Sequence, residues 1–282
     1  MARIVIAGCG DVGGALGRLL AAAGHTVWGL RRRPDALPPG LRPIAADLTD
    51  PASLTGLPDD LDAVFYTAAA AGRDEDHYRR AYVDGPIRLL AALRDMGQQP
   101  RRVFFTSSTA VYAQNDGGWV DEDSPAAAQG FAGRLLRQGE AAVLDGPFPA
   151  TVVRLAGIYG PGRTRLIDSL RAGTAACAPG RYTNRIHRDD AAAALAHLLG
   201  LDAPAALYLG VDDTPALHCE VLGWLARHLG VAPPRVDAGA AAAGSKRCSN
   251  ARLRASGFRP RYPGYRQGYA ALLAQSSQGL LG

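Results

Sequence analysis

The chain has 282 residues, of which 48% are hydrophobic and 20% charged, and its formal net charge at pH 7 is +5. These values are ordinary for a soluble globular protein that forms one large domain or two closely joined ones. Because no apolar run is long enough to span a bilayer and the first residues enter a predicted strand at once, we expect a cytoplasmic protein with no membrane partner.

Almost all of the positive charge is arginine, since Lys246 is the one lysine in the chain. The arginines are dispersed apart from Arg31-Arg32-Arg33, and no known nucleic-acid-binding motif accompanies them. We therefore expect small anionic phosphates as partners, and no nucleic acid. The cysteines form no C-x-x-C pair and the histidines no ligand spacing, so we predict reduced thiols and no metal site. The four cysteines are Cys9, Cys177, Cys219 and Cys248.

Strand-like and helix-like segments alternate through the first half of the chain. Strands are predicted over residues 3–7, 26–30, 41–45, 63–67, 102–106 and 151–155. Helices are predicted over residues 11–23, about 74–96 with an interruption at Pro86, and 133–144. In the first helix, Leu16, Leu19 and Leu20 are expected to lie on one face. This alternation predicts an α/β fold in which a doubly wound parallel sheet carries helices on both faces.

A glycine-rich turn follows the first predicted strand and opens the first predicted helix. Its glycines have the spacing Gly8-x-Gly10-x-x-Gly13. Gly8 lets the chain turn sharply, Gly10 lets the backbone approach a pyrophosphate, and Gly13 lets the helix pack on the strand. The N–H groups of the first helical turn, which includes Asp11 and Val12, then face the anion. The pattern predicts a Rossmann-type dinucleotide site.

Arginine follows the second predicted strand, where the adenosine ribose of a dinucleotide binds. Arg31 and Arg32 begin the basic run, and no acidic residue comes before Asp35. A guanidinium pairs with a 2′-phosphate, whereas a carboxylate would select the free 2′-hydroxyl. The sequence therefore predicts NADP rather than NAD.

Residues after the other strands complete the predicted cofactor site. Asp47 and Leu48 follow the third strand, where a carboxylate can meet the adenine amino group. Ala68 and Ala69 follow the fourth strand, where small side chains let the backbone pass close to the cofactor. Ser107, near the end of the fifth strand, is assigned to the same site.

The pattern is less regular in the second half. We predict a helix over 190–199, a strand over 206–209 that returns to the sheet, and a helix over 215–229 capped by Thr214. A loop over 230–244 and short helices near 250–255 and 265–273 complete the chain. We therefore divide it into a dinucleotide-binding Rossmann domain, residues 1–156, and a smaller, irregular C-terminal part, residues 157–282, that binds substrate.

Several segments, in this order, are similar to the extended short-chain dehydrogenase/reductases, the NAD(P)-dependent epimerase/dehydratase superfamily. They are the glycine turn, Asp47-Leu48, Ser107-Ser108-Thr109-Ala110-Val111-Tyr112, Ile158-Tyr159-Gly160-Pro161-Gly162, Arg185-Ile186-His187-Arg188-Asp189-Asp190 and Ser245-Lys246-Arg247-x-x-Asn250. The resemblance covers nearly the whole chain. It implies a Rossmann domain, a nicotinamide cofactor and a small-molecule substrate.

The resemblance also implies a catalytic Ser, a Tyr, and a Lys four residues after the Tyr, which together bind substrate oxygen and transfer a proton. Ser108 matches the serine. The helix before the sixth strand contains no tyrosine or lysine between Gln129 and Glu140. A frequent asparagine of the family is replaced by Asp84. The chain therefore resembles the atypical members, in which catalytic residues are lost.

Four residues are candidates for catalysis. Ser108 lies beside the expected nicotinamide, Tyr112 and Tyr159 follow the fifth and sixth strands, and Asp84 would act if burial changed its proton affinity. Tyr159 is also assigned to the cofactor site. For both tyrosines, packing in the core is the competing interpretation.

Three functions remain open from the sequence. The first is an NADP-dependent oxidoreductase or epimerase that acts on a small carbonyl or hydroxyl substrate with an atypical proton donor. The second is a non-redox lyase or cyclase on the same scaffold, and the third is a non-catalytic NADP-binding sensor or assembly protein. A monomer and a homodimer are both compatible with the sequence.

Overall fold

The computed structural model describes residues 1–237 and 245–278, and the chain divides into two compact units. The first unit consists of Met1–Tyr112, Ala126–Arg154 and Ala192–Tyr208. The second unit contains Ala113–Pro125, Leu155–Ala191 and the described residues from Leu209 onward. The boundary between the two units therefore crosses the chain several times, whereas the predicted domains are divided once, at residue 156. Residues 192–208 return to the first unit, and residues 113–125 leave it.

A seven-stranded sheet forms the centre of the first unit, in the order β12-β7-β5-β4-β1-β2-β3. The pairs β1–β2, β1–β4, β2–β3 and β4–β5 are parallel. The strands are β1 (Arg3–Ala7), β2 (Thr26–Arg31), β3 (Arg42–Ala45), β4 (Ala63–Tyr66), β5 (Arg102–Ser108), β7 (Ala150–Leu155) and β12 (Leu207–Gly210). Their apolar runs are buried because helices cover both faces of the sheet.

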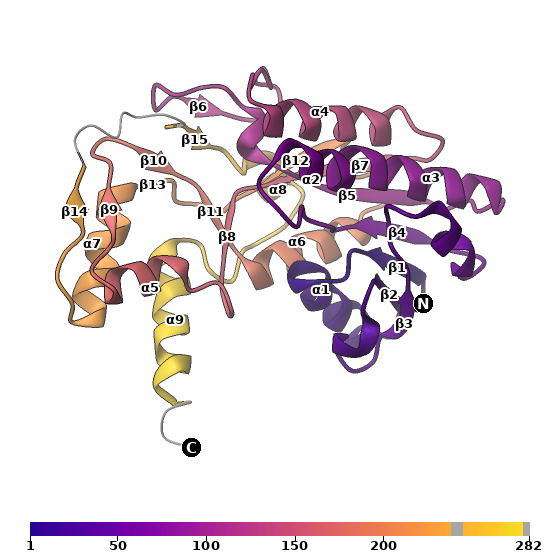
Figure 1. The fold of residues 1–282 in the computed structure, drawn as a ribbon, viewed down its shortest axis with the longest axis horizontal. Helices are drawn as coiled ribbons and strands as arrows, with labels where there is room; N and C mark the ends of the chain where they lie inside the picture. Colours follow the sequence, from indigo (N-terminus) through magenta and orange to yellow (C-terminus); the bar gives the residue numbers. More distant parts are fainter. Residues whose placement is uncertain (238–244, 279–282) are drawn as a thin grey trace. The chain divides into compact units, whose positions relative to one another are not determined.

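The helices of this unit lie in two layers. In Figure 1, α3 (Gly85–Asp95) and α4 (Phe131–Leu144) cover one face, and α1 (Asp11–Ala22) and α6 (Arg188–Leu199) cover the other. This arrangement confirms the predicted doubly wound Rossmann-type fold. None of the described helices is both long enough and apolar enough to cross a membrane.

The buried face of α1 differs from the prediction at one position. Leu16 and Leu20 are buried as expected, but Leu19 is 43% exposed. The buried residues of α1 are Val12 to Gly17 and Leu20. Leu19 therefore does not share the burial of Leu16 and Leu20, although residues three apart in a helix lie on neighbouring positions of one face.

The helical stretch predicted near 74–96 is a composite of three pieces. The helix α2 (Glu75–Arg79) runs into a π-helical turn, Arg80–Asp84, and then into α3. Asp74 caps α2 by accepting a hydrogen bond from His77 N at 3.0 Å. Such π-helical turns leave backbone groups available for other partners, and they are frequent near functional sites.

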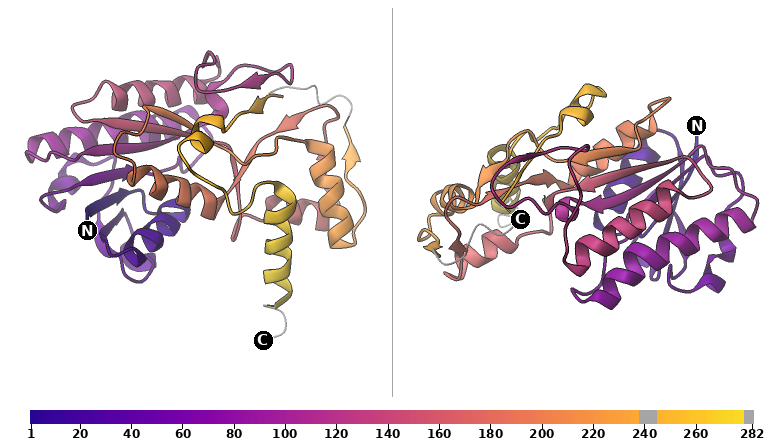
Figure 2. Two further views of the ribbon diagram at one scale, coloured as in Figure 1. Left: turned by 180° about the vertical axis from the view of Figure 1, so that it is seen from behind. Right: turned by 90° about the horizontal axis from the view of Figure 1, so that it is seen from above.

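The second unit combines short strand pairs with helices, of which α7 and α9 are the orange and yellow helices of Figure 2. Its helices are α5 (Arg165–Arg171), α7 (His218–Leu229), α8 (Ala251–Ala255) and α9 (Tyr265–Gln278). Its strands are β6 (Trp119–Val120), β8 (Gly157–Tyr159), β9 (Ala176–Cys177), β10 (Tyr182–Thr183), β11 (Arg185–His187), β13 (Ala216–Leu217), β14 (Arg235–Val236) and β15 (Arg247–Cys248).

Two predictions on this unit are corrected. The helix expected over 215–229 begins at His218, because Ala216 and Leu217 form β13, and its first-residue cap is therefore not Thr214. Thr214 instead donates its hydroxyl to the carbonyl of Pro263 at 3.1 Å. The predicted loop over 230–244 contains β14, and residues 238–244 lie outside the described part of the chain.

The prediction of four reduced cysteines is wrong for two of them. Cys177 in β9 and Cys219 in the first turn of α7 form a disulfide, with their Cα atoms 4.9 Å apart. The two residues are 42 positions apart in sequence, so spacing alone does not reveal that the fold brings them together. Cys9 and Cys248 are buried free thiols.

Candidate functional site

The carboxyl ends of the parallel strands bring the predicted cofactor residues of the first unit to one edge of the sheet. From β1, the strand order runs to β2 and β3 on one side and to β4 and β5 on the other. Ligands of doubly wound sheets bind at such a reversal, outside the carboxyl ends of the strands. Gly8 follows β1 and Ala68 follows β4, so both lie at this switch point.

The glycine turn has the conformation and the close packing that its spacing predicts. Gly8 has a φ of +77°, and a Cβ there would overlap the backbone of Ala68. A Cβ on Gly13 would lie 2.5 Å from Thr67 Oγ1 and 3.0 Å from Ile6 Cγ2. Both glycines therefore let neighbouring backbone segments approach within the first unit.

Gly10 differs from the other two glycines because its missing side chain faces open space. A Cβ there would meet only the carbonyl oxygen of Gly8, at 3.8 Å. Gly10 also precedes α1, whose N-terminus has no side-chain cap. Asp11 and Val12 lie in the first turn, where backbone N–H groups lack partners within the helix. An open cradle of N–H groups beside exposed Gly10 fits a pyrophosphate.

The ends of β2 and β3 bring basic and acidic groups together. Arg31 pairs in register with Ala45, two residues before Asp47. Arg31 is half-buried and donates to the carbonyl of Ala36 at 3.3 Å, while Arg32 is exposed. Hydrogen bonds from the backbone and hydroxyl of Thr49 lower the pKa of Asp47, and the charge of Arg32 lowers it further. Arg32 thus lies close enough to Asp47 for its charge to stabilise the ionised carboxylate.

The loops after β3 and β4 hold the remaining predicted cofactor residues. Leu48 packs partly buried against a hydrophobic cluster of the first unit that includes Val5 and Tyr66, and so does Ala68. Ala69 is exposed. These small or apolar side chains leave the backbone accessible at the sheet edge.

Two adjacent serines at the end of β5 have different surroundings. Ser108 is partly exposed, and its Oγ accepts a hydrogen bond from Ala110 N at 3.2 Å. Ser107 is buried and donates its hydroxyl to Glu140 Oε1 at 2.5 Å. Solvent and a ligand can therefore reach Ser108. Ser107 is inaccessible, and its hydrogen bond connects β5 to Glu140 of α4.

A buried polar network connects Ser107 to Tyr112. Arg154 Nε and Nη2 donate to the Glu140 carboxylate at 2.9 and 2.7 Å, and Arg154 Nη1 donates to the Tyr112 hydroxyl at 2.7 Å. The side chains of Arg154 and Glu140 are 8% and 6% exposed. The sequence prediction did not assign a role to this pair. The available signal was an arginine inside the largely apolar strand β7 and a glutamate on the buried face of α4.

The predicted candidate Asp84 ends the π-helical turn and is half-buried. The turn presents the carbonyl of Ala81 to the Tyr66 hydroxyl, which donates to it at 2.5 Å. Burial raises the pKa of Tyr66, and the charges of Tyr82 and Asp84 raise it further. On α4, Gly139 has no room for a Cβ, because one would overlap the carbonyl of Tyr82. The helix without the Tyr-Lys pair is therefore packed directly on this turn.

The predicted candidate Tyr159 belongs to the second unit, where it has the surroundings of a core residue. It is 3% exposed, stacks on Tyr269 with ring centroids 4.6 Å apart, and meets His187 edge to face. Its hydroxyl donates to the carbonyl of Gly264 at 3.4 Å, and Gly268 in α9 leaves space for it. Burial raises the pKa of Tyr159 well above its ordinary range.

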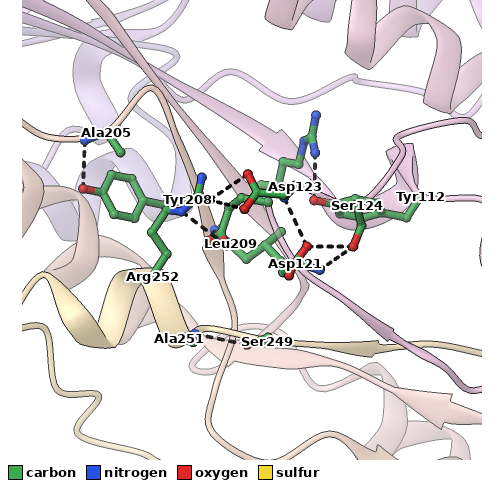
Figure 3. A network of polar contacts seen from close by, with 12 residues as sticks. Tyr112, Asp121, Asp123, Ser124, Ala205, Tyr208, Leu209, Ser249, Ala251 and Arg252 are labelled. Carbon is green, nitrogen blue, oxygen red and sulfur yellow. Dashed lines mark hydrogen bonds and ion pairs between the residues drawn. The ribbon is translucent and has the colours of Figure 1, made fainter.

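A second polar network, shown in Figure 3, stabilises the second unit near β6. Arg252 forms a two-atom contact with the Asp123 carboxylate at 2.7 and 2.8 Å. Asp121 accepts from the Ser124 hydroxyl at 2.7 Å, and Glu122 accepts from Leu209 N at 2.7 Å. An open depression of about 330 Å³ lies next to it, lined by Trp119, Val120, Asp121 and Ser249. Asp121, Asp123 and Glu122 are already engaged in structural contacts here.

With this geometry established, comparison with known proteins identifies the class. A model of the NAD dependent epimerase/dehydratase family matches residues 4–199, more than half of the chain. The chain therefore belongs to this family.

Two curated relatives match part of the chain. D-erythronate dehydrogenase of Cupriavidus necator is 37% identical over 110 residues, which are 37% of this chain and 34% of the relative. The 2-alkyl-3-oxoalkanoate reductase of Stenotrophomonas maltophilia is 30% identical over 185 residues, which are 60% of this chain and 54% of the relative. The matches thus span between a third and about half of the length of these relatives.

Solved structures match nearly the whole chain. A protein of Methylobacillus flagellatus, described as an NAD-dependent epimerase/dehydratase, is 38% identical with a TM-score of 0.82 and covers 98% of this chain and 99% of its own. WbmG of Bordetella bronchiseptica in complex with NAD is 21% identical, with a TM-score of 0.82 and coverages of 98% and 94%. Human SDR39U1 with NADPH is 22% identical, with a TM-score of 0.76 and coverages of 94% and 97%. At these low identities, WbmG and SDR39U1 show that their fold is shared with this chain.

Proposed function

We propose that this chain is an NADP-dependent oxidoreductase or epimerase acting on a small substrate that carries a carbonyl or hydroxyl group. The observation that carries the proposal is the cradle at the switch point. There the exposed Gly10 and the N-terminus of α1 leave room for a pyrophosphate, and strand ends on both sides supply the predicted contacts. The names of the curated relatives, a dehydrogenase and a reductase, support redox chemistry.

The preference for NADP rests on Arg31 and Arg32 at the end of β2. A guanidinium attracts a 2′-phosphate. The charge of Arg32 also lowers the pKa of Asp47, which follows the neighbouring strand β3. The fold accommodates either cofactor, since WbmG binds NAD and SDR39U1 binds NADPH. The arginines therefore decide the specificity in this proposal.

Within the site, we assign Ser108 the role of binding the substrate oxygen, because it is the partly exposed hydroxyl at the end of β5. NADP supplies or accepts the hydride when it is bound. Tyr112 and Tyr159 are buried and hydrogen-bonded within their own units, so we propose that each has a structural role, and that the proton is exchanged with water beside Ser108 or with Asp84.

Titration of the protein with NADPH and NADH tests the cofactor assignment. We expect NADPH to bind at least about tenfold more tightly, and the double variant Arg31→Ala/Arg32→Ala to lose that preference while retaining NADH binding. Arg101→Gln is the control, since Arg101 is exposed outside these strand ends. Equal or tighter binding of NADH by the native protein would overturn the assignment.

A panel of small aldehydes, ketones and oxo acids with NADPH tests the reaction. We expect NADPH oxidation in stoichiometric proportion to product, and a loss of about 100-fold or more in kcat for Ser108→Ala. Turnover without a change in nicotinamide absorbance would instead show a lyase or cyclase. NADPH binding with no turnover across the panel would favour a sensor.

A further inference from the structure

The two cysteines of the disulfide have different surroundings within the second unit. Cys177 in β9 is 2% exposed and belongs to an apolar cluster that includes Val221 and Leu225. Cys219 is half-buried in the first turn of α7. The bond therefore joins a core strand to the start of the helix beside it, as Figure 1 shows for β9 and α7. Of the two side chains, that of Cys219 is the more open to solvent.

The position of Cys219 favours a negatively charged sulfur when the bond is open. It is the second residue of α7, a helix of 12 residues. The backbone N–H groups and the dipole of a first helical turn stabilise an anion. Leu217, which precedes the helix, has no side-chain acceptor for these N–H groups. The thiolate of Cys219 would therefore not compete with a capping side chain.

Positive charge from other segments acts on the same helical turn. His218 N donates to the carbonyl of Arg181 at 2.8 Å, so the segment before β10 lies against the start of α7. Burial lowers the pKa of His218. The charges of three arginines lower it further, those of Arg181, Arg185 and Arg165. This positive field also favours a thiolate over a thiol at Cys219.

The acidic groups near the disulfide are accompanied by arginines. Glu220, also in the first turn of α7, forms an ion pair with Arg266 of α9 at 2.7 Å. On the side of β9, Asp237 N donates to the carbonyl of Cys177 at 2.9 Å, and Arg235 lies two residues before Asp237. These groups add charge of both signs, so the positive field at the start of α7 remains.

The other two cysteines provide an internal contrast. Burial raises the pKa of Cys9 to about 11 and that of Cys248 to about 12. Both are buried free thiols that stay protonated at neutral pH, and a protonated thiol is a poor nucleophile. A reagent selective for thiolates therefore distinguishes these two sites from the cysteine pair.

We propose that Cys177 and Cys219 are a reversible thiol–disulfide pair that exchanges with small-molecule disulfides of the glutathione class, with Cys219 as the attacking thiolate. The Cys219 sulfur attacks one sulfur of the small disulfide, which forms a mixed disulfide and releases one small thiolate. Cys177 then loses its proton and attacks the Cys219 sulfur, which forms the protein disulfide and releases the second small thiolate. Two protein thiols are oxidised, and the small disulfide is reduced to two thiols that take up the protons. This exchange is independent of the proposed NADP site.

Equilibration in mixtures of reduced and oxidised glutathione, followed by maleimide trapping and mass spectrometry, tests reversibility. We expect the disulfide to open in excess reduced glutathione and to form again in excess oxidised glutathione. Cys177→Ser should accumulate one glutathione per chain on Cys219, and Cys219→Ser should accumulate at least about tenfold less. A native disulfide that persists in every mixture would show an inert structural bond and overturn the proposal.

Alkylation of the reduced protein by iodoacetamide at neutral pH, measured site by site, tests the assignment of the attacking sulfur. We expect Cys219 to react at least about tenfold faster than the other three cysteines, and Arg181→Gln to slow it about threefold or more. Arg171→Gln, at an exposed arginine of the same unit, is the matched control and should leave the rate unchanged. Equal rates at all four cysteines, or faster reaction at Cys177, would overturn the proposal, and circular dichroism shows whether the reduced protein keeps its fold.

Discussion

Glu140 on α4 and Arg154 on β7 form a two-point ion pair inside the first unit, with nitrogen–oxygen distances of 2.9 and 2.7 Å. Ser107 donates to this pair from one side, and the pair donates to the Tyr112 hydroxyl on the other. Ser107 directly precedes Ser108 in the sequence, and Tyr112 follows Ser108 by four residues. The ion pair therefore stabilises the end of β5, where the proposed substrate-binding hydroxyl lies.

Removal of one charge from this pair should destabilise the protein strongly. Glu140→Gln leaves the Arg154 guanidinium buried without a counter-charge, which costs about 3–5 kcal/mol in free energy of unfolding. The measurement is urea denaturation at neutral pH. Arg94→Met is the matched control, because the Arg94–Asp95 pair is more than half exposed, and it should change stability by less than about 1 kcal/mol. Similar effects of the two substitutions would show that the buried pair contributes little.

Two glycines of the same turn should respond in opposite ways to substitution by alanine. Gly10→Ala adds a methyl group to open space at a negative φ, so stability should change by less than about 1 kcal/mol while NADPH affinity falls at least about tenfold. Gly13→Ala drives a Cβ against Thr67 and Ile6, so it should cost about 1–3 kcal/mol of stability. Thermal unfolding and NADPH titration of both variants test this contrast. Unimpaired NADPH binding by Gly10→Ala would contradict the placement of the pyrophosphate.

The sequence was sufficient to predict features that depend on local pattern. Alternating apolar strands and helices predicted the doubly wound sheet, and the glycine spacing identified the turn at its switch point. Contacts between residues that are far apart in the sequence have no such local pattern. Cys177 and Cys219 meet only because β9 lies beside α7, and Glu140 meets Arg154 only because α4 packs on the sheet. Sequence spacing does not encode these tertiary contacts.

The same limit applies to the candidate catalytic residues. Tyr112 and Tyr159 each follow a strand, and strand ends often carry functional groups. Whether such a side chain points toward solvent or into the core is decided by packing partners, here Arg154 for Tyr112 and the α9 glycine Gly268 for Tyr159. That no tyrosine or lysine lies between Gln129 and Glu140 was readable from the sequence, whereas the packing partners of Tyr112 and Tyr159 were not.

Asp212 should make the stability of the protein depend on pH. Its pKa rises by burial from about 4 in the unfolded chain to about 8 in the fold, where Thr214 N and Arg185 favour the charged form and Asp213 and Asp190 oppose it. Its contribution to stability is therefore complete below about pH 4 and is lost as the pH rises through 8, by roughly 5 kcal/mol at most.

The variant Asp212→Asn removes this titration and should flatten the decline in unfolding free energy between about pH 4 and 8. Denaturation at a series of pH values measures it. Asp202→Asn, at an exposed carboxyl, is the control and should leave the slope unchanged. An unaltered slope in Asp212→Asn would show that this carboxyl is ionised in the folded protein at neutral pH.

The Cys177–Cys219 disulfide should stabilise the second unit. It closes a loop of about 42 residues, and the chain-entropy model gives about 4 kcal/mol for a loop of that length. Dithiothreitol should therefore lower the stability of the native protein by that amount and leave the double variant Cys177→Ser/Cys219→Ser unaffected. Thiol titration of the denatured, unreduced protein provides an independent check, because the bonded form exposes Cys9 and Cys248 alone. Four titratable thiols in protein purified without reductant would contradict the pairing.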